Sequence, residues 1–156
     1  MLKKYFIFVL LFLSSFSLYG QYGKTIASLP FRGKDITKEE SEYLASMFAT
    51  EFVARGYTLV SRTSALEEVY GEIEYQRSGA TSAAIEAGKQ LGADYVIVGK
   101  IDYVFGRLAL TTQVIGVEEA RIIASANEQI SDIYSINQEL ASKMVKKIVL
   151  DMSIAL

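Results

Sequence analysis

The stretch that most constrains the fold runs from Gly88 to Ile101 and reads GKQLGADYVIVGKI. A helix is expected to end at Gly92, and the chain then enters an apolar strand without a linker. Residues 95–98 are apolar at every position instead of alternating with polar ones, which predicts a strand buried on both faces. Such a strand lies in the middle of a sheet and needs covering elements on either side.

The helix expected before this strand, over about residues 81–91, carries small side chains on one face. Gly88 is expected to cost about 1 kcal/mol of helix stability relative to alanine. A nearly smooth face lets a helix approach a sheet closely, so the composition of this face predicts tight packing of the helix on the strand. The residues that share it are Ala84, Ala87, Gly88 and Leu91.

Hydrophobic periodicity and end signals define the other helices. Three pairs have capping-box spacing, in which each side chain satisfies the backbone donor of the other: Thr37 with Glu40, Ser64 with Glu67, and Ser135 with Gln138. The first of these helices is expected to stop at Gly56, because glycine readily adopts the left-handed conformation that ends a helix. The second runs to about residue 73, and the third carries its apolar stripe to Met152.

Four more strands are expected, over residues 24–31, 57–61, 107–117 and 121–130. In the first of them, alternation predicts that Ile26 faces one way and that Leu29 and Phe31 face the other. Pro30, the only proline, is expected to end this strand because it lacks a ladder donor. The turn at 105–107 and the turn at 118–120 are short, which implies an antiparallel meander of the last three strands.

The predicted order is therefore β-α-β-α-α-β-β-β-α. Early strands separated by helices favour parallel pairing, whereas the later strands favour antiparallel pairing. We predict an α/β fold of three layers, with a mixed parallel and antiparallel sheet and helices on both faces. No repeat or linker divides the chain, so residues 24–156 are expected to form one domain.

The N-terminus has the layout of a secretory signal peptide. A basic start, residues 1–4, precedes a mostly apolar run from Tyr5 to Phe16, and small residues follow up to Gly20. The apolar run is shorter than the about 20 residues that span a membrane, so we expect cleavage near Gly20. An uncleaved anchor is the alternative. After cleavage no stable membrane span is expected, and the protein is predicted to be periplasmic or secreted.

Composition argues against most catalytic chemistry. The chain has no cysteine and no histidine, which excludes disulfides, a cysteine nucleophile, a lipid-modified cysteine and the commonest metal ligands. The 16 basic and 18 acidic residues nearly balance, and no basic stripe suits nucleic acid. We predict that the chain is not an enzyme, and we assign it no catalytic, cofactor-binding or metal-binding residue.

The acidic residues have structural interpretations. Of the acid pairs at 39–40, 67–68 and 118–119, the first two lie at helix starts, where the dipole and capping explain them, and the third lies in a turn. Asp94 is expected to accept backbone hydrogen bonds at the helix-to-strand turn. Arg62 is expected to pair with an acid such as Glu67 or Asp94 and so to fix the second strand against the following helix. The ten tyrosines suit interfaces, yet most are expected to be half-buried core residues.

Several of these segments together resemble the CsgG-like family, named for the curli assembly/transport component CsgG and including the penicillin-binding-protein activator LpoB. The matching segments are IASLPF (26–31), LVSR (59–62) leading into Leu66 and Glu67, GKQLGADYVIVG (88–99) and RIIASA (121–126). Their order and spacing cover residues 24–131. The resemblance implies a globular envelope domain that works through binding or assembly.

The chain departs from that family in three respects. It has no cysteine to be lipidated and no further segments for a barrel, so pore formation is not expected. Only residues 21–23 separate the expected signal from the first strand, so it is not expected to reach across a cell wall as a tethered activator does. The family's aspartate-x-x-threonine-glycine turn is replaced by GVEEA at 116–120.

Two functional hypotheses follow. The first is an exported, non-enzymatic envelope module that contacts a protein partner or its own copies through variable edges such as 76–80 and 104–107. The second is a small exported hydrolase or ligand-binding protein that uses carboxylates or a serine. The second hypothesis requires a pocket in which acids converge around Asp94, Asp102 and the loop from Gln76 to Ala80.

Overall fold

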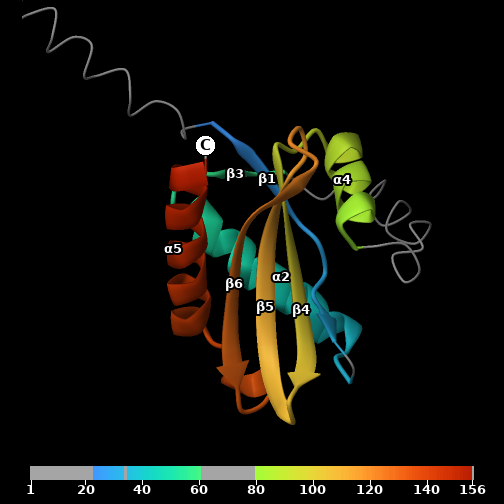
Figure 1. The fold of residues 1–156 in the computed structure, drawn as a ribbon, viewed down its shortest axis with the longest axis vertical. Coiled ribbons are helices and arrows are strands. Elements are labelled where there is room, and N and C mark those ends of the chain that lie inside the picture. The colour runs from blue at the N-terminus through green and yellow to red at the C-terminus, as the bar shows by residue number, and fades with distance from the viewer. Residues whose placement is uncertain (1–22, 34, 61–79, 156) are drawn as a thin grey trace, which may run out of the picture.

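The structure, a computed structural model, describes residues 23–33, 35–60 and 80–155 (Figure 1). The predicted signal segment and the predicted helix at 64–73 lie outside these residues. The described elements are β1 (Thr25–Ser28), β2 (Arg32–Gly33), α2 (Lys38–Val53), β3 (Thr58–Leu59), α4 (Ala80–Leu91), β4 (Tyr95–Val104), β5 (Arg107–Gly116), β6 (Arg121–Ile130), the short 3₁₀-helix η2 (Ile133–Ser135) and α5 (Gln138–Ala155).

The strands form one mixed sheet. Its order is β3-β1-β4-β5-β6, and β2 pairs with β4 beyond the end of β1. The pairs β1–β3, β1–β4 and β2–β4 are parallel, whereas β4–β5 and β5–β6 are antiparallel. The prediction of early parallel strands followed by an antiparallel meander is therefore confirmed.

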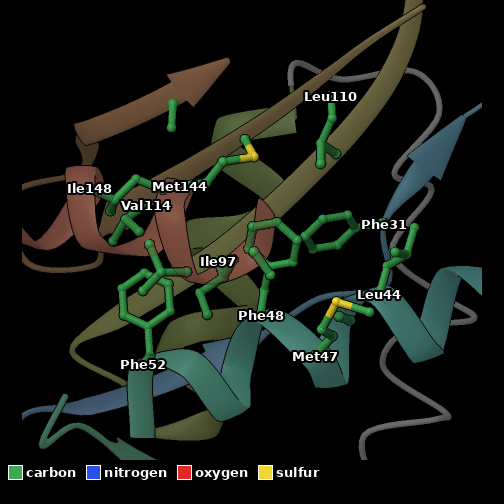
Figure 2. Packing of buried hydrophobic residues seen from close by; sticks show 14 of the residues in the cluster. Phe31, Leu44, Met47, Phe48, Phe52, Ile97, Leu110, Val114, Met144 and Ile148 are labelled. Atoms are coloured by element: carbon green, nitrogen blue, oxygen red, sulfur yellow. The ribbon is translucent and has the colours of Figure 1, made fainter. Parts of the chain in front are cut away.

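β4 is the central strand and is covered on both faces. Tyr95 and Ile97 belong to a large apolar cluster that also holds the buried faces of α2 and α5. Figure 2 shows side chains from these helices meeting those of the sheet in this cluster. Val96 and Val98 point the other way, into a smaller cluster with Ala84 of α4. The three predicted layers are thus present, with α2 and α5 on one face and α4 on the other.

The close approach of α4 to the sheet is also confirmed. A Cβ atom added at Gly88 would lie 2.5 Å from Cγ2 of Val117 and 2.7 Å from Cγ2 of Val96. Gly92 then ends the helix with a φ of 65°, in the left-handed region that glycine adopts without steric cost. Gly88 therefore allows α4 to approach the sheet closely, and Gly92 allows the helix to end in the left-handed conformation just before β4.

The prediction that Phe31 and Leu29 lie on the same face of the sheet is wrong. Leu29 packs in the α4 cluster as alternation predicts, but Phe31 lies in the cluster of α2 and α5. Between the register pairs 28–97 and 32–100, the segment that joins β1 to β2 has one residue more than β4. One extra residue reverses the alternation of side chains, as in a bulge. This excess lies around Pro30, where the ladder cannot continue.

The helix ends agree in part with expectation. Thr37 and Glu40 form the predicted capping box of α2, with the backbone N–H of Thr37 donating to Glu40 over 2.8 Å and that of Glu40 donating to the Thr37 hydroxyl over 3.1 Å. Ser135 is not the cap of α5. The backbone N–H of Leu140 donates to the Asn137 side chain over 3.0 Å, whereas Ser135 ends η2. Asn137 and Ser135 have equally suitable side chains, and the intervening turn decides between them.

In the described part of the chain, none of the helices combines the length and the apolar character needed to cross a membrane. The predictions of signal cleavage and of a single domain over 24–156 concern residues beyond this part as well, and they stay predictions.

The switched Phe31 ring covers a glycine of the central strand. A Cβ atom added at Gly99 would lie 2.3 Å from this ring. The ring also contacts Phe48 of α2, with centroids 4.9 Å apart. Gly99 thus leaves the space in which the segment between β1 and β2 packs against both β4 and α2.

Replacing Gly99 by alanine is expected to destabilise the fold by about 1–3 kcal/mol, because the new methyl group overpacks the core against the Phe31 ring. Urea unfolding followed by far-ultraviolet circular dichroism measures the loss. In the double variant Gly99→Ala/Phe31→Leu, the smaller side chain should give up part of that clash, so the combined loss should be less than the sum of the two single losses. Additive losses would show that the two residues do not interact.

Candidate functional site

The loop between β4 and β5 is the most unusual surface feature of the described chain. It consists of Phe105 and Gly106, because Val104 and Arg107 are paired in the ladder. Both loop residues have positive φ, 51° and 77°, as a type I′ hairpin turn requires. Glycine suits such a turn, but a bulky residue in the left-handed region costs about 1–2 kcal/mol. The fold itself would be served better by asparagine at this position.

Phe105 has no packing role that would offset this cost. Phe105 is fully exposed to solvent. Tyr103, 69% exposed, and Val104 are also largely in solvent. We call residues 103–107 the hairpin tip. An exposed aromatic residue held in strained backbone points to recognition, because the fold gains nothing from either property.

Another exposed aromatic side chain lies at the same end of the molecule. Tyr134 of η2 is 85% exposed, and η2 follows the end of β6, where Ile130 pairs with Leu108 near the start of β5. The pKa of Glu40 is lowered by hydrogen bonds from the backbone and hydroxyl of Thr37, with a further one from Tyr134. β4 and β6 end here, whereas β1 starts and α5 finishes at the opposite end (Figure 1).

A groove opens beside the hairpin tip, between the end of β6 and the start of α5. Its volume is about 520 Å³. Ile130 and Leu140 supply apolar surface, and Gln129, Glu139 and Lys143 supply polar surface. We call it the end groove. Sequence reasoning did not find it, because it depends on the place at which α5 starts relative to β6.

The tyrosines divide between core and surface. Tyr57 and Tyr95 are buried and lie with their ring centroids 6.2 Å apart. Burial, together with the neighbouring Tyr95, raises the pKa of Tyr57 to about 12. Tyr103 and Tyr134 are exposed at the hairpin end, and Tyr43 is exposed on α2. The expectation that most tyrosines are core residues therefore holds for Tyr57 and Tyr95, which are buried more deeply than expected, and is wrong for Tyr103 and Tyr134.

The acids named by the hydrolase hypothesis do not converge. Asp94 precedes β4 and Asp102 lies near its far end, about 27 Å away along an extended strand. The Asp102 carboxylate pairs with Lys100 at 2.7 Å, and both side chains are substantially exposed. The loop segment 76–79 lies outside the described residues. Among the described residues, no three acids come together as metal ligands would.

The acid pairs predicted at helix starts and in a turn lie in such positions where the structure describes them. Glu39 and Glu40 lie in the first turn of α2, as expected. Glu119 folds back over Gly116 in the turn before β6, where a Cβ atom would lie 2.1 Å from its carboxylate oxygen. Glu67, Glu68 and Arg62 lie outside the described residues.

A buried carboxylate that sequence reasoning missed ties α2 to α5. Glu51 pairs with Arg55 at 2.5 Å and also accepts from the amide of Gln138. Arg55 donates to the backbone carbonyl of Ser142 over 3.0 Å and to its hydroxyl over 2.9 Å. The hydrogen bond from Arg55 lowers the pKa of Glu51 against the opposing effect of burial. Because its surroundings are occupied by α5, this carboxylate joins two helices and does not open onto a site.

Asp94 has the structural role that the sequence predicts. Its carboxylate accepts from the backbone N–H of Thr25 over 2.7 Å, from the Thr25 hydroxyl over 2.9 Å and from Lys24 over 3.3 Å. Burial alone would raise the pKa of Asp94, but the hydrogen bonds from Thr25 and Lys24 outweigh it and lower the pKa. Asp94 therefore fastens the start of β1 to the entrance of β4.

Replacing Asp94 by asparagine is expected to lower the free energy of unfolding at pH 7 by about 1–2 kcal/mol, because the charge-assisted hydrogen bonds are lost. Since the folded-state pKa of Asp94 lies below its unfolded value, its contribution is present above the unfolded pKa and disappears as the pH falls through the folded pKa. Urea unfolding at pH 7 and pH 2.5 should therefore show a difference from the native chain that shrinks in acid. Asp102→Asn, which breaks an exposed pair, is the control and should change stability little. A gap that stays constant with pH would contradict this role.

Comparison with known proteins places the fold. No protein-family model and no curated protein sequence matches the chain. Among solved structures, the C-terminal domain of LpoB from Escherichia coli is similar at 22% identity and a TM-score of 0.53, over 72% of this chain and 85% of that one. TolB from Acinetobacter baumannii is similar at 14% identity and 0.51, over 84% of this chain and 28% of TolB. The PelC dodecamer from Paraburkholderia phytofirmans is similar at 16% identity and 0.50, over 83% and 88%.

These similarities define the class to which the structure belongs. The chain has the mixed α/β fold of the LpoB C-terminal domain, as the sequence resemblance implies. At this level of identity the likeness concerns the fold alone. The fold does not define the role of the hairpin tip, which depends on the residues of the tip itself.

Replacing Phe105 by asparagine is expected to stabilise the isolated protein by about 1 kcal/mol, because asparagine tolerates the left-handed region and Asn-Gly is favoured in type I′ turns. Thermal or urea unfolding measures the gain. Phe105→Ala is the matched control, since alanine removes the ring but keeps an unfavourable backbone conformation, and its stability should stay close to that of the native chain. A destabilised asparagine variant would show that the ring supports the fold.

Proposed function

We propose that this chain is an exported, non-enzymatic protein of the cell envelope that acts as a binding or assembly module. It works through protein–protein contacts, and the hairpin tip is its main contact. The observation that carries the proposal is Phe105, a large apolar side chain that is fully exposed on strained backbone. Aromatic residues, including phenylalanine, are enriched in protein interfaces, where buried aromatic anchors fill pockets on the partner.

The location and the type of function have separate support. The basic start and apolar run of residues 1–16 are typical of an export signal. The sequence segments resemble a family of envelope proteins, and the fold is that of the LpoB C-terminal domain. PelC, which shares the fold, is a dodecamer, so this architecture is compatible with assembly. The acids of the hydrolase hypothesis lie far apart, and no observation favours that alternative.

The contact is tested by a photo-reactive amino acid at position 103 of the full chain, in cells of the organism that makes it. Ultraviolet light should link the hairpin tip to protein in the envelope fraction. The same label at Leu150 on the outer face of α5 is the control, because Leu150 is 61% exposed and Tyr103 is 69% exposed. The control should give far fewer adducts. Equal adducts at both positions, none at 103, or a chain found only in the cytosol would each contradict the proposal.

A further inference from the structure

We propose that the partner at the hairpin tip is a second copy of this chain, and that each Phe105 enters the end groove of the other copy. This inference rests on the proposed function, since it names the protein that the tip contacts. The two copies meet end to end across a twofold axis. Each therefore gives a hairpin tip and receives one.

The arrangement of tip and groove within one copy suits such an exchange. Ile130 of the end groove pairs with Leu108, which lies three residues beyond Phe105. The two features are therefore neighbours at one end of the sheet, yet Phe105 is fully exposed and does not fill the groove of its own chain. A twofold axis through this end brings each tip to the other groove, and one self-complementary surface makes both contacts. β1 starts and α5 finishes at the far end, away from the axis (Figure 1).

The groove offers a site for an aromatic ring. The end groove has a volume of about 520 Å³ and is open to solvent, so a side chain of another molecule can enter it. Ile130 and Leu140 both line the groove; Leu140 is half-buried and supplies most of this apolar surface, whereas Ile130 is buried and supplies its edge. Transfer of the Phe105 ring from water to this surface is favourable, and the exchange places two such rings in one interface.

The charges beside the ring and on the groove wall are complementary. Arg107 is exposed, and its guanidinium donates to the amide oxygen of Gln129 over 3.0 Å, with no carboxylate partner among the described residues. Glu139 on the groove wall is exposed and forms no ion pair within the described chain, whereas Lys143 is already paired with Glu128 at 2.9 Å. Docking of Phe105 brings Arg107 to the groove wall, where Glu139 supplies the opposite charge.

The test is the oligomeric state of the purified, exported protein, measured by light scattering after size exclusion and by sedimentation. The native chain should be a dimer. Phe105→Asn should raise its dissociation constant at least about tenfold, and so should Arg107→Glu and Glu139→Arg. The double variant Arg107→Glu/Glu139→Arg carries both charges reversed and should regain most of the affinity. Leu150→Asn at the far end is the control and should leave the dimer unchanged.

Cross-linking locates the contact. Because the chain has no cysteine, Arg107→Cys and Glu139→Cys can be purified separately and mixed under mild oxidation. The mixture should give a disulfide-linked pair, and either variant alone should give much less. A native chain that is monomeric at its highest soluble concentration would overturn the inference, and so would a dimer that survives Phe105→Asn or a mixture without the linked pair.

The failure of this inference and that of the proposed function are distinguishable. A monomer whose label at position 103 links to a different envelope protein would overturn the second-copy inference and support the protein-contact function. A monomer with no adduct at position 103 would overturn both.

Discussion

The burial of β4 on both faces is the constraint on which the rest of the structure depends, and two missing side chains make it possible. On one face, Gly99 leaves room for the Phe31 ring, which connects the segment between β1 and β2 to α2. On the other face, Gly88 of α4 leaves room for Val96 and Val117. Each glycine therefore sets the distance of one covering layer from the central strand. Larger residues would separate the layers and leave apolar surface of β4 without close partners, at a cost that grows with the void created.

The sequence predicts this central arrangement well because its signals are local. A non-alternating apolar run indicates a strand buried on both faces, and a smooth helix face indicates close packing. It predicts the side of Phe31 badly, because that side depends on one extra residue relative to β4, and register belongs to a pair of strands. The end groove is missed for a similar reason. Its walls come from β6 and α5, and neither segment alone indicates that a groove lies between them.

The acidic residues show that composition alone does not predict a catalytic site, because the position of each acid in the fold decides which groups it contacts. Asp94 and Asp102 suggest a pair of catalytic acids only while their spacing is unknown. One fastens β1 to the start of β4, and the other pairs with Lys100 on an exposed part of the same strand. Glu51 is the most buried acid among the described residues, and its hydrogen bonds join α2 to α5. Perturbed carboxylates often mark active sites, but here their partners are structural.

The hairpin tip combines a left-handed backbone with an exposed aromatic side chain, and this combination lowers stability without a gain in packing within the described chain. The pairing of β4 with β5 is unbroken from Tyr95 to Val104, so the buried half of the strand holds the exposed half rigidly. The irregularity of the meander lies between β5 and β6 instead, near Val114. A rigid anchor loses little conformational entropy on binding, so more of the free energy of ring burial remains as affinity. The two-residue turn fixes the direction of Phe105 as well. The cost of its left-handed backbone is thus the cost of presenting one aromatic ring, in one orientation, at the end of the central strand.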